Sequence, residues 1–483
     1  MKKRIFIYLS ICVVLASSLF LTGLKENVGS KYKYPENNII LISIDTLRAD
    51  HLGCYGYHRN TSPNIDRLTE ESIVFDNTFS HIASTVPSHM TMITSLYPSI
   101  HEAYQLSAKV MEYFELSKSI VTLPQILKKK KYTTGAFVSL PDGHGFGRGV
   151  DMFKDCDLVQ WCTVGEEKKE PFFSDNELFE WIEENKDKKF FLFFHTYSVH
   201  DPYISPDYEL FSADYDGDIP DTYDDWKKLD LAEISWQDKL RKSNPPSDEY
   251  LRDIQHLIDL YDGCIAYTDR QLGFLFKRLE KLDLFKKSIV ILTADHGEEF
   301  NEHGGLGHGA LWREHLHVPL IIKLPNNIKK RIRSDVGLID IVPTVLDLAG
   351  INFKPKKYSF QGESLLGAIK GRPNIRDIYA EFAGRTGPNY KKDLAYFFSL
   401  KTKKWKYLEC EDGGSNLFNI ISDPEEKDNV IFDYPTVSQT IIQKLRNINQ
   451  NNKKLRSRLK VNKTTFTIHD EALKRLRALG YVN

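Results

Sequence analysis

Short apolar runs, most of which end in acidic residues or histidines, limit the fold of this chain most strongly. Four of them are NIILISID (38–45), KKFFLFFHTYSVHDPY (188–203), KKSIVILTADHGEEF (286–300) and VPLIIKLP (318–325). Each run predicts a buried strand, and the amphipathic pattern of residues 247–282 predicts a long helix. Strands that alternate with helices indicate an α/β domain with a mostly parallel sheet.

The ends of these strands carry residues that can bind a metal ion. Asp45, His200, Asp295 and His296 fall at carboxyl ends of predicted strands, where open α/β sheets hold their ligands. Oxygen and nitrogen donors together suit Mn²⁺ or Zn²⁺ better than a site made only of oxygens does. His195 lies five residues before His200, so a continuous strand points the two rings to opposite faces. We therefore expect only His200 to reach the site.

The segment ASTVPSHMTMITSLYP (83–98) raises a different question, because a hydroxyl stands two residues before a proline. Ser84 and Thr85 both fit the cap of a helix that runs through Met92. The same helix end presents free N–H groups and a partial positive charge, which would hold a phosphate or sulfate. A neighbouring metal ion would turn the hydroxyl into a nucleophile. Thr85 is thus predicted to be both cap and nucleophile.

Two more histidines, His303 and His308, sit in the glycine-rich stretch NEHGGLGHGA directly after the third strand. Such a loop has no core for either ring to fill. A ligand or acid role therefore competes with plain packing for both residues.

The N-terminus and the composition bear on location. MKKR precedes an uncharged apolar run of 20 residues, which indicates a signal peptide or a membrane anchor. We expect an exported protein that is periplasmic, extracellular or held on the outer face of the cytoplasmic membrane. With 41% hydrophobic and 27% charged residues the chain is a globular enzyme or binder, and a net charge of -1 argues against nucleic acid as a partner.

The predicted organisation has four parts: an export segment (1–24), a linker (25–37), a catalytic α/β domain (38–378) and a C-terminal subdomain (379–483). The catalytic domain contains an irregular insertion at about 205–246. In the C-terminal subdomain, short strand-like pieces after residue 379 predict a small antiparallel sheet. A charged helical pattern after residue 436 predicts a helical tail.

Taken together, these stretches resemble the sulfatase family of the alkaline phosphatase superfamily. The matching stretches include NIILISIDTLRADHLGCYGYHRNTSPNIDRL, TVPSHMTMITSLYPSIH, LYDGCIAYTDRQLG, LTADHGEEFNEHGGLGHG, LIDIVPTVLDLAGI and LRALGYV, in collinear order. The resemblance implies an alkaline phosphatase-like three-layer sandwich. It also implies one divalent metal ion, with Mn²⁺, Zn²⁺, Ca²⁺ and Mg²⁺ left open.

The resemblance implies roles for the matched residues. Asp45, Asp295 and His296 hold the metal together with Thr85, which falls at the nucleophile position. His200 and His308 serve the leaving group or its charge. His89 stands where the family signature has arginine, and with His303 it is expected to contact the substrate.

Departures from the family pattern point away from sulfate. Sulfatases oxidise a cysteine or serine to formylglycine, whereas a threonine would give a ketone, so no formylglycine is expected. Thr46 replaces the second metal-binding aspartate, His296 replaces an asparagine, and GAFVSLPDG replaces a stretch with a sulfate-binding lysine. A threonine beside one metal looks like the phosphotransferases and phosphodiesterases of the bacterial envelope.

The sequence therefore predicts an exported, metal-dependent hydrolase that cleaves a phosphoric or sulfuric ester through Thr85, and it favours a phosphoester or phosphodiester. The expected substrate is an anionic ester of a glycan, a lipid headgroup or a small molecule. A sulfuric ester hydrolase, an envelope phosphotransferase and a non-catalytic binder of anionic glycans remain as alternatives.

Overall fold

The computed structural model describes eleven stretches of the chain. They are residues 32–103, 112–139, 145–155, 177–212, 215–217, 219–220, 247–372, 375–384, 395–411, 413–462 and 464–467. The predicted export segment, most of the predicted insertion and the terminal LRALGYV lie outside them. Within these stretches, no helix combines the length and the apolar character needed to cross a membrane.

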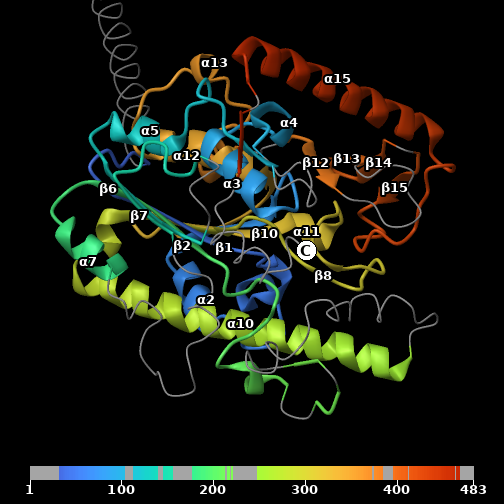
Figure 1. Cartoon of the computed structure of the whole chain (residues 1–483), viewed down its shortest axis with the longest axis horizontal. Coiled ribbons are helices and arrows are strands. Elements are labelled where there is room, and N and C mark those ends of the chain that lie inside the picture. The colour runs from blue at the N-terminus through green and yellow to red at the C-terminus, as the bar shows by residue number, and fades with distance from the viewer. Residues whose placement is uncertain are drawn as a thin grey trace, which may run out of the picture.

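A central sheet of eight strands organises the fold (Figure 1). Its order is β11-β2-β10-β7-β1-β6-β4-β5. The bounds are β1 Asn38–Ile44, β2 Ser72–Phe79, β4 Thr133–Val138, β5 Met152–Asp155, β6 Phe190–Thr196, β7 Ser288–Ala294, β10 His317–Lys323 and β11 Lys330–Gly337. Only β10 runs against the other described strands, pairing antiparallel with β7 and β2. The prediction of a mostly parallel sheet is confirmed.

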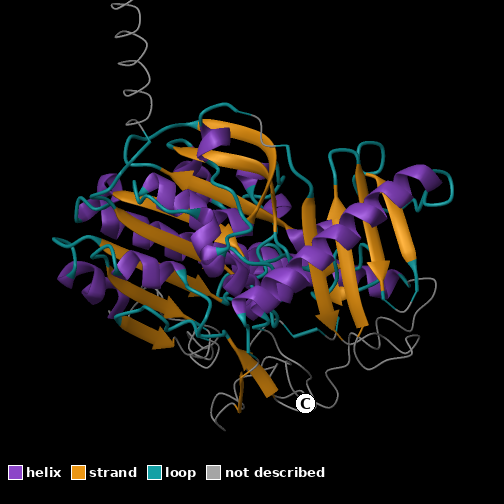
Figure 2. Cartoon of the chain, turned by 90° about the horizontal axis from the view of Figure 1, so that it is seen from above, coloured by secondary structure: helices purple, strands orange, loops and turns teal. Residues whose placement is uncertain are grey.

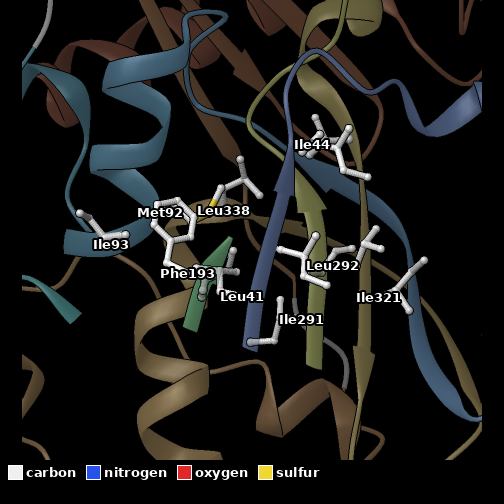
Figure 3. Close-up of a cluster of buried hydrophobic side chains, with 14 of the residues drawn as sticks. Leu41, Ile44, Met92, Ile93, Phe193, Ile291, Leu292, Ile321 and Leu338 are labelled. Atoms are coloured by element: carbon white, nitrogen blue, oxygen red, sulfur yellow. The ribbon is translucent and has the colours of Figure 1, made fainter. Parts of the chain in front are cut away.

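The four apolar runs became β1, β6, β7 and β10. All seven residues of β1 are buried, because helices cover both faces of the sheet. Each fully buried isoleucine or leucine of this kind contributes about 1.5–3 kcal/mol relative to exposure. Figure 3 shows Leu41 of β1 beside Phe193 of β6, with Met92 and Ile93 of the covering helix next to them.

Helices form the outer two layers. The longer ones are α2 Pro63–Thr69, α3 Thr85–Thr94, α5 Leu123–Lys128, α7 Glu177–Glu184, α10 Asp248–Lys281 and α12 Ile341–Leu348, and the single turns are α4 Pro98–His101, α11 Arg313–Leu316, α13 Pro355–Tyr358 and α14 Leu366–Ile369. The helices α2 and α10 cover one face, while α3, α5 and α12 cover the other (Figure 1). The prediction of a helix over 247–282 is confirmed, and the Ser247 side chain caps it by accepting from the Tyr250 N–H.

A separate antiparallel sheet follows, beside the central one (Figure 2). It consists of β12 Ile378–Gly384, β13 Ala395–Lys401, β14 Trp405–Cys410 and β15 Ser415–Asn419, and the helix α15 Pro435–Leu459 packs against it. This confirms the small antiparallel sheet predicted for the C-terminal part, whereas the exact domain boundaries stay a prediction. Two short ribbons, β3 Glu112–Glu115 with β16 Thr464–Thr467 and β8 Glu299–Phe300 with β9 Leu306–Gly307, complete the described strands.

Candidate active site

The candidate site begins where two neighbouring parallel strands end. Ile44 of β1 lies opposite Ala294 of β7, so the next residues, Asp45 and Asp295, emerge side by side at the same sheet edge. His296 follows Asp295 directly. Asp45, Asp295 and His296 are buried, and each offers one ligand atom within 4.8 Å of the others. The structure thus brings together the three residues expected at these strand ends.

Hydrogen bonds leave one oxygen of each carboxylate without a partner. The Oδ1 atom of Asp295 accepts from the backbone N–H groups of Thr46 at 3.2 Å and His296 at 2.9 Å. The Oδ2 atom of Asp45 lies 3.2 Å from Nε2 of His195. The remaining atoms, Oδ1 of Asp45 and Oδ2 of Asp295, are buried and accept no hydrogen bond from the described residues. A buried acceptor of this kind calls for a cation or a donor.

The protonation of the His296 ring also indicates that a cation binds here. Its Nδ1–H donates to the Gly297 carbonyl at 3.0 Å, so its Nε2 atom carries a lone pair. That nitrogen lies 3.3 Å from Oδ2 of Asp295, although both atoms are acceptors. Two acceptors so close together repel each other unless a positive ion lies between them. The residues therefore fit a divalent metal ion bound by two oxygens and one nitrogen.

Electrostatics point in the same direction. Burial raises the pKa of Asp45, and repulsion from Asp295 and Glu298 raises it further. Burial also raises the pKa of Asp295 and lowers that of His296. A divalent cation reverses these effects, since it favours ionised carboxylates and a neutral imidazole.

Thr85 stands at the edge of this cluster. It is the first residue of α3, and Ser84 takes the cap position without a side-chain hydrogen bond to the helix. The expectation that Thr85 is itself the cap is therefore wrong by one residue. The Thr85 Oγ1 atom lies 3.4 Å from Nε2 of His296, and the hydroxyl lowers the pKa of Asp45. The hydroxyl thus lies between the positively polarised N-terminus of α3 and the three candidate metal ligands.

His89 lies one turn further along α3 and is fully buried. Its Nδ1–H donates to the Thr85 carbonyl at 2.8 Å, while its Nε2 is 2.9 Å from the Ser43 hydroxyl. Both ring nitrogens are used inside the protein. The predicted contact between His89 and a substrate has no free nitrogen to make it, and the ring instead holds the first turn of α3 against β1.

Two further histidines border the cluster. The His308 ring lies 4.6 Å from that of His296 and 5.1 Å from that of His200, measured between centroids. His308 Nδ1 bonds to the buried Glu298 carboxylate at 3.1 Å. Burial lowers the pKa of His308, but attraction to Glu298 outweighs it and raises the pKa overall. Burial and the neighbouring His308 lower the pKa of His200, so a proton shared between the two rings favours His308.

The other histidines are placed differently from expectation. His303 stacks on Trp312 at 4.0 Å and pairs with Glu314 at 3.2 Å, so its ring is engaged by these two residues. The expectation that only one of His195 and His200 reaches the site is wrong. The strand β6 ends at Thr196 and the chain then turns, so strand alternation does not relate the two rings.

Sequence reasoning missed Glu298 and the role of His195. His195 could have been found from strand order, because it lies opposite Ser43 on the neighbouring β1, two residues before Asp45. Glu298 carried only one signal, its place three residues after Asp295 in the same strand-end turn.

Comparisons with known proteins identify the family of the chain. The Sulfatase family model matches residues 37–351, and the model described as N-sulphoglucosamine sulphohydrolase, C-terminal, matches residues 301–454. A Formosa agariphila protein named Sulfatase is 25% identical over 467 residues, which cover 88% of each chain. Human arylsulfatase K is 34% identical over 211 residues, which cover 41% of this chain and 38% of that protein.

Solved structures confirm the fold. The phosphonate monoester hydrolase of Agrobacterium radiobacter superposes with a TM-score of 0.68 at 19% identity, over 86% of this chain and 96% of that one. This likeness bears out the alkaline phosphatase-like architecture. With the family model matched over residues 37–351, the chain belongs to the sulfatase family and is a hydrolase that acts on ester bonds.

Proposed function

We propose that this protein hydrolyses a phosphoester, above all a phosphodiester, with Thr85 as the nucleophile. The observation that carries the proposal is the position of the Thr85 hydroxyl, at the N-terminus of α3 and 3.4 Å from the Nε2 atom of His296. A hydroxyl in this place can attack an ester held by the helix end and by a cation in the Asp45, Asp295 and His296 set.

The identity of the residue favours phosphorus over sulfur. A sulfatase of this family leaves its intermediate through a formylglycine hydrate, which collapses to an aldehyde and expels sulfate. The Cβ atom of Thr85 carries a methyl group, so oxidation would give a ketone. A phosphothreonine needs no such exit, because water can attack phosphorus in line and break the bond to the Thr85 oxygen.

The charge balance favours a monoanionic substrate. The two carboxylates of Asp45 and Asp295 would neutralise one divalent ion, and the Glu298 carboxylate lies against His308 at 3.1 Å. The described site therefore carries little positive charge beyond the end of α3. A phosphodiester or a sulfate monoester brings one negative charge to such a site, whereas a phosphomonoester brings up to two.

In the proposed reaction each side chain has one task. A divalent ion in the site would supply Lewis-acid polarisation of the ester and ease ionisation of the nearby hydroxyl. Thr85 loses its hydroxyl proton to solvent and attacks phosphorus, which breaks the bond between phosphorus and the leaving oxygen. His308, whose protonated form the Glu298 carboxylate favours, donates its proton to the leaving oxygen and afterwards takes one from the attacking water. His200 is neutral and can accept a hydrogen bond from the released alcohol.

A sulfuric ester hydrolase is the second candidate, and the names of the curated relatives favour it. Transfer of the phosphoryl group to an acceptor alcohol is the third, since the same phosphothreonine would serve it. We propose an exported location, on the strength of the apolar N-terminal run. Glycans and lipid headgroups outside the cytoplasm are then the natural anionic esters.

The test compares three aryl esters of the same phenol: a methyl phosphodiester, a sulfate and a phosphate monoester. We expect the diester to be cleaved fastest, Thr85→Ala to abolish the reaction, and the neighbouring Ser84→Ala to retain it as a matched control. An added acceptor alcohol that diverts the product into a new diester would instead indicate transfer. Faster sulfate cleavage that survives Thr85→Ala would overturn the assignment.

A further inference from the structure

His195 is a buried histidine on β6 that contacts a candidate metal ligand without being placed to bind the metal itself. Its Nε2 lies 3.2 Å from Oδ2 of Asp45, and its Nδ1 has no partner among the described residues. Since an ionised carboxylate only accepts, Nε2 carries the proton and donates it to Asp45. The parallel pairing of β6 with β1 fixes this contact from the backbone.

The contact decides how Asp45 can coordinate. With Oδ2 taken by the His195 N–H, only Oδ1 is left to face an ion. Asp295 is limited in the same way, because two backbone N–H groups occupy its Oδ1. Both carboxylates are therefore arranged to give one oxygen each.

Thr46 adds no ligand to this set. Its hydroxyl donates to the Val199 carbonyl at 3.0 Å, and its backbone adopts a left-handed conformation with φ 53°. The arrangement thus offers one oxygen from Asp45, one from Asp295 and one nitrogen from His296, with Thr85 next to them.

We propose that His195 is a positioning residue that holds Asp45 as a one-oxygen ligand and thereby selects Mn²⁺ or Zn²⁺ over Ca²⁺. Calcium takes six to eight oxygen ligands and commonly uses both oxygens of a carboxylate. Mn²⁺ and Zn²⁺ bind with fewer donor atoms than calcium does, and they accept an imidazole nitrogen as a ligand. Removing the His195 N–H frees Oδ2 of Asp45. Calcium can then use both oxygens of this carboxylate, whereas Mn²⁺ or Zn²⁺ loses a ligand that is held in a fixed orientation.

The inference rests on the metal site that the proposed function uses, but it does not rest on phosphoester chemistry. Its readout is metal affinity, measured by competition with a chromophoric chelator for Mn²⁺, Zn²⁺ and Ca²⁺ separately. If the three aryl esters were all left intact while the affinities behaved as expected, the proposed function would fail and this inference would stand.

His195→Leu removes the donor, and we expect Mn²⁺ and Zn²⁺ binding to weaken about 10- to 100-fold, as for other partners of metal ligands. Calcium binding should weaken less, or strengthen, so that the preference for Mn²⁺ over Ca²⁺ falls at least about tenfold. His101→Gln, at a buried histidine whose ring bonds to Thr91, Ala103 and the backbone of Pro87, should leave all three affinities unchanged.

A second pair of variants decides the matter if His195→Leu does not fold. His195→Gln keeps an N–H at the end of a side chain of similar reach and should retain most of the preference, whereas the shorter His195→Asn should lose it. The absorption spectrum of bound Co²⁺ should change in the Asn variant and resemble the wild type in the Gln variant. Equal weakening for all three metals, or no weakening, would overturn the proposal.

Discussion

Removal of the metal ion should destabilise the protein, because the site then holds two buried carboxylates with nothing between them. Asp45 and Asp295 are both fully buried, and one oxygen of each has no partner in the described structure. Their mutual repulsion is one of the causes that raise the pKa of Asp45. Holding such charges out of water without compensation costs several kcal/mol per ion.

The size of the effect follows from binding linkage. A metal ion present at about 1,000 times its dissociation constant stabilises the folded state by about 4 kcal/mol. Unfolding entropy of about 2 cal/mol/K per residue gives about 1 kcal/mol/K for a chain of 483 residues. We therefore expect chelation to lower Tm by about 4 °C, and added metal to restore it.

Calorimetry of Asp45→Asn separates this explanation from general ion effects. The variant loses a charged ligand and also the repulsion between carboxylates. Its metal-dependent shift in Tm should therefore shrink to below about 1 °C, and its metal-free form should be at least as stable as the metal-free wild type. The exposed Asp216→Asn is the control and should keep the full shift. A full metal shift in Asp45→Asn, or a metal-free form several degrees less stable than wild type, would show that the two buried carboxylates do not cause the metal dependence.

Three further predictions concern single residues. Thr85→Ser keeps a hydroxyl and should retain measurable diester hydrolysis, while Thr85→Ala should lose about 10⁴-fold or more in kcat, and equal rates for the two variants would contradict a nucleophilic role. His308→Ala should slow esters of poor leaving groups by about 10²- to 10⁴-fold and spare nitrophenyl esters, so a uniform loss across a leaving-group series would argue against proton donation. Burial lowers the pKa of His101 to about 3, below its value of about 6.5 in the unfolded chain. The stability that the neutral His101 ring contributes is therefore present above about pH 6.5 and is lost as the pH falls. At pH 5 this loss amounts to about 2 kcal/mol, and urea titrations should show His101→Gln to be less acid-sensitive than the wild type by that amount.

Much of the fold and part of the site could be predicted from sequence, where local pattern and strand geometry act together. The long helix α10 and the strands β1, β6, β7 and β10 have strong periodicity or long apolar runs. Asp45, Asp295 and His296 follow from the rule that parallel strands end at one edge. The strands β2, β4, β5 and β11 escaped prediction; β5 and β11 are edge strands with polar residues, and β11 reads KRIRSDVG.

The remaining parts of the site depend on tertiary contacts that a linear pattern does not contain. His89 looked like a substrate contact, yet the packing of α3 on β1 uses both of its nitrogens. His195 was set aside by strand alternation, although β6 ends before His200. Glu298 was overlooked, since only the folded loop brings it to His308.

A covalent intermediate on Thr85 can be detected by mass spectrometry of the Thr85 peptide after rapid acid quench during turnover. We expect an unmodified threonine in the resting enzyme and a phosphoryl-ester adduct on Thr85 when an aryl phosphodiester is present. Thr85→Ser should show the same adduct on serine. A carbonyl at position 85 in the resting enzyme, or turnover of the diester with no adduct under conditions in which the second step is slow, would rule out Thr85 as the nucleophile of a phosphoester hydrolase.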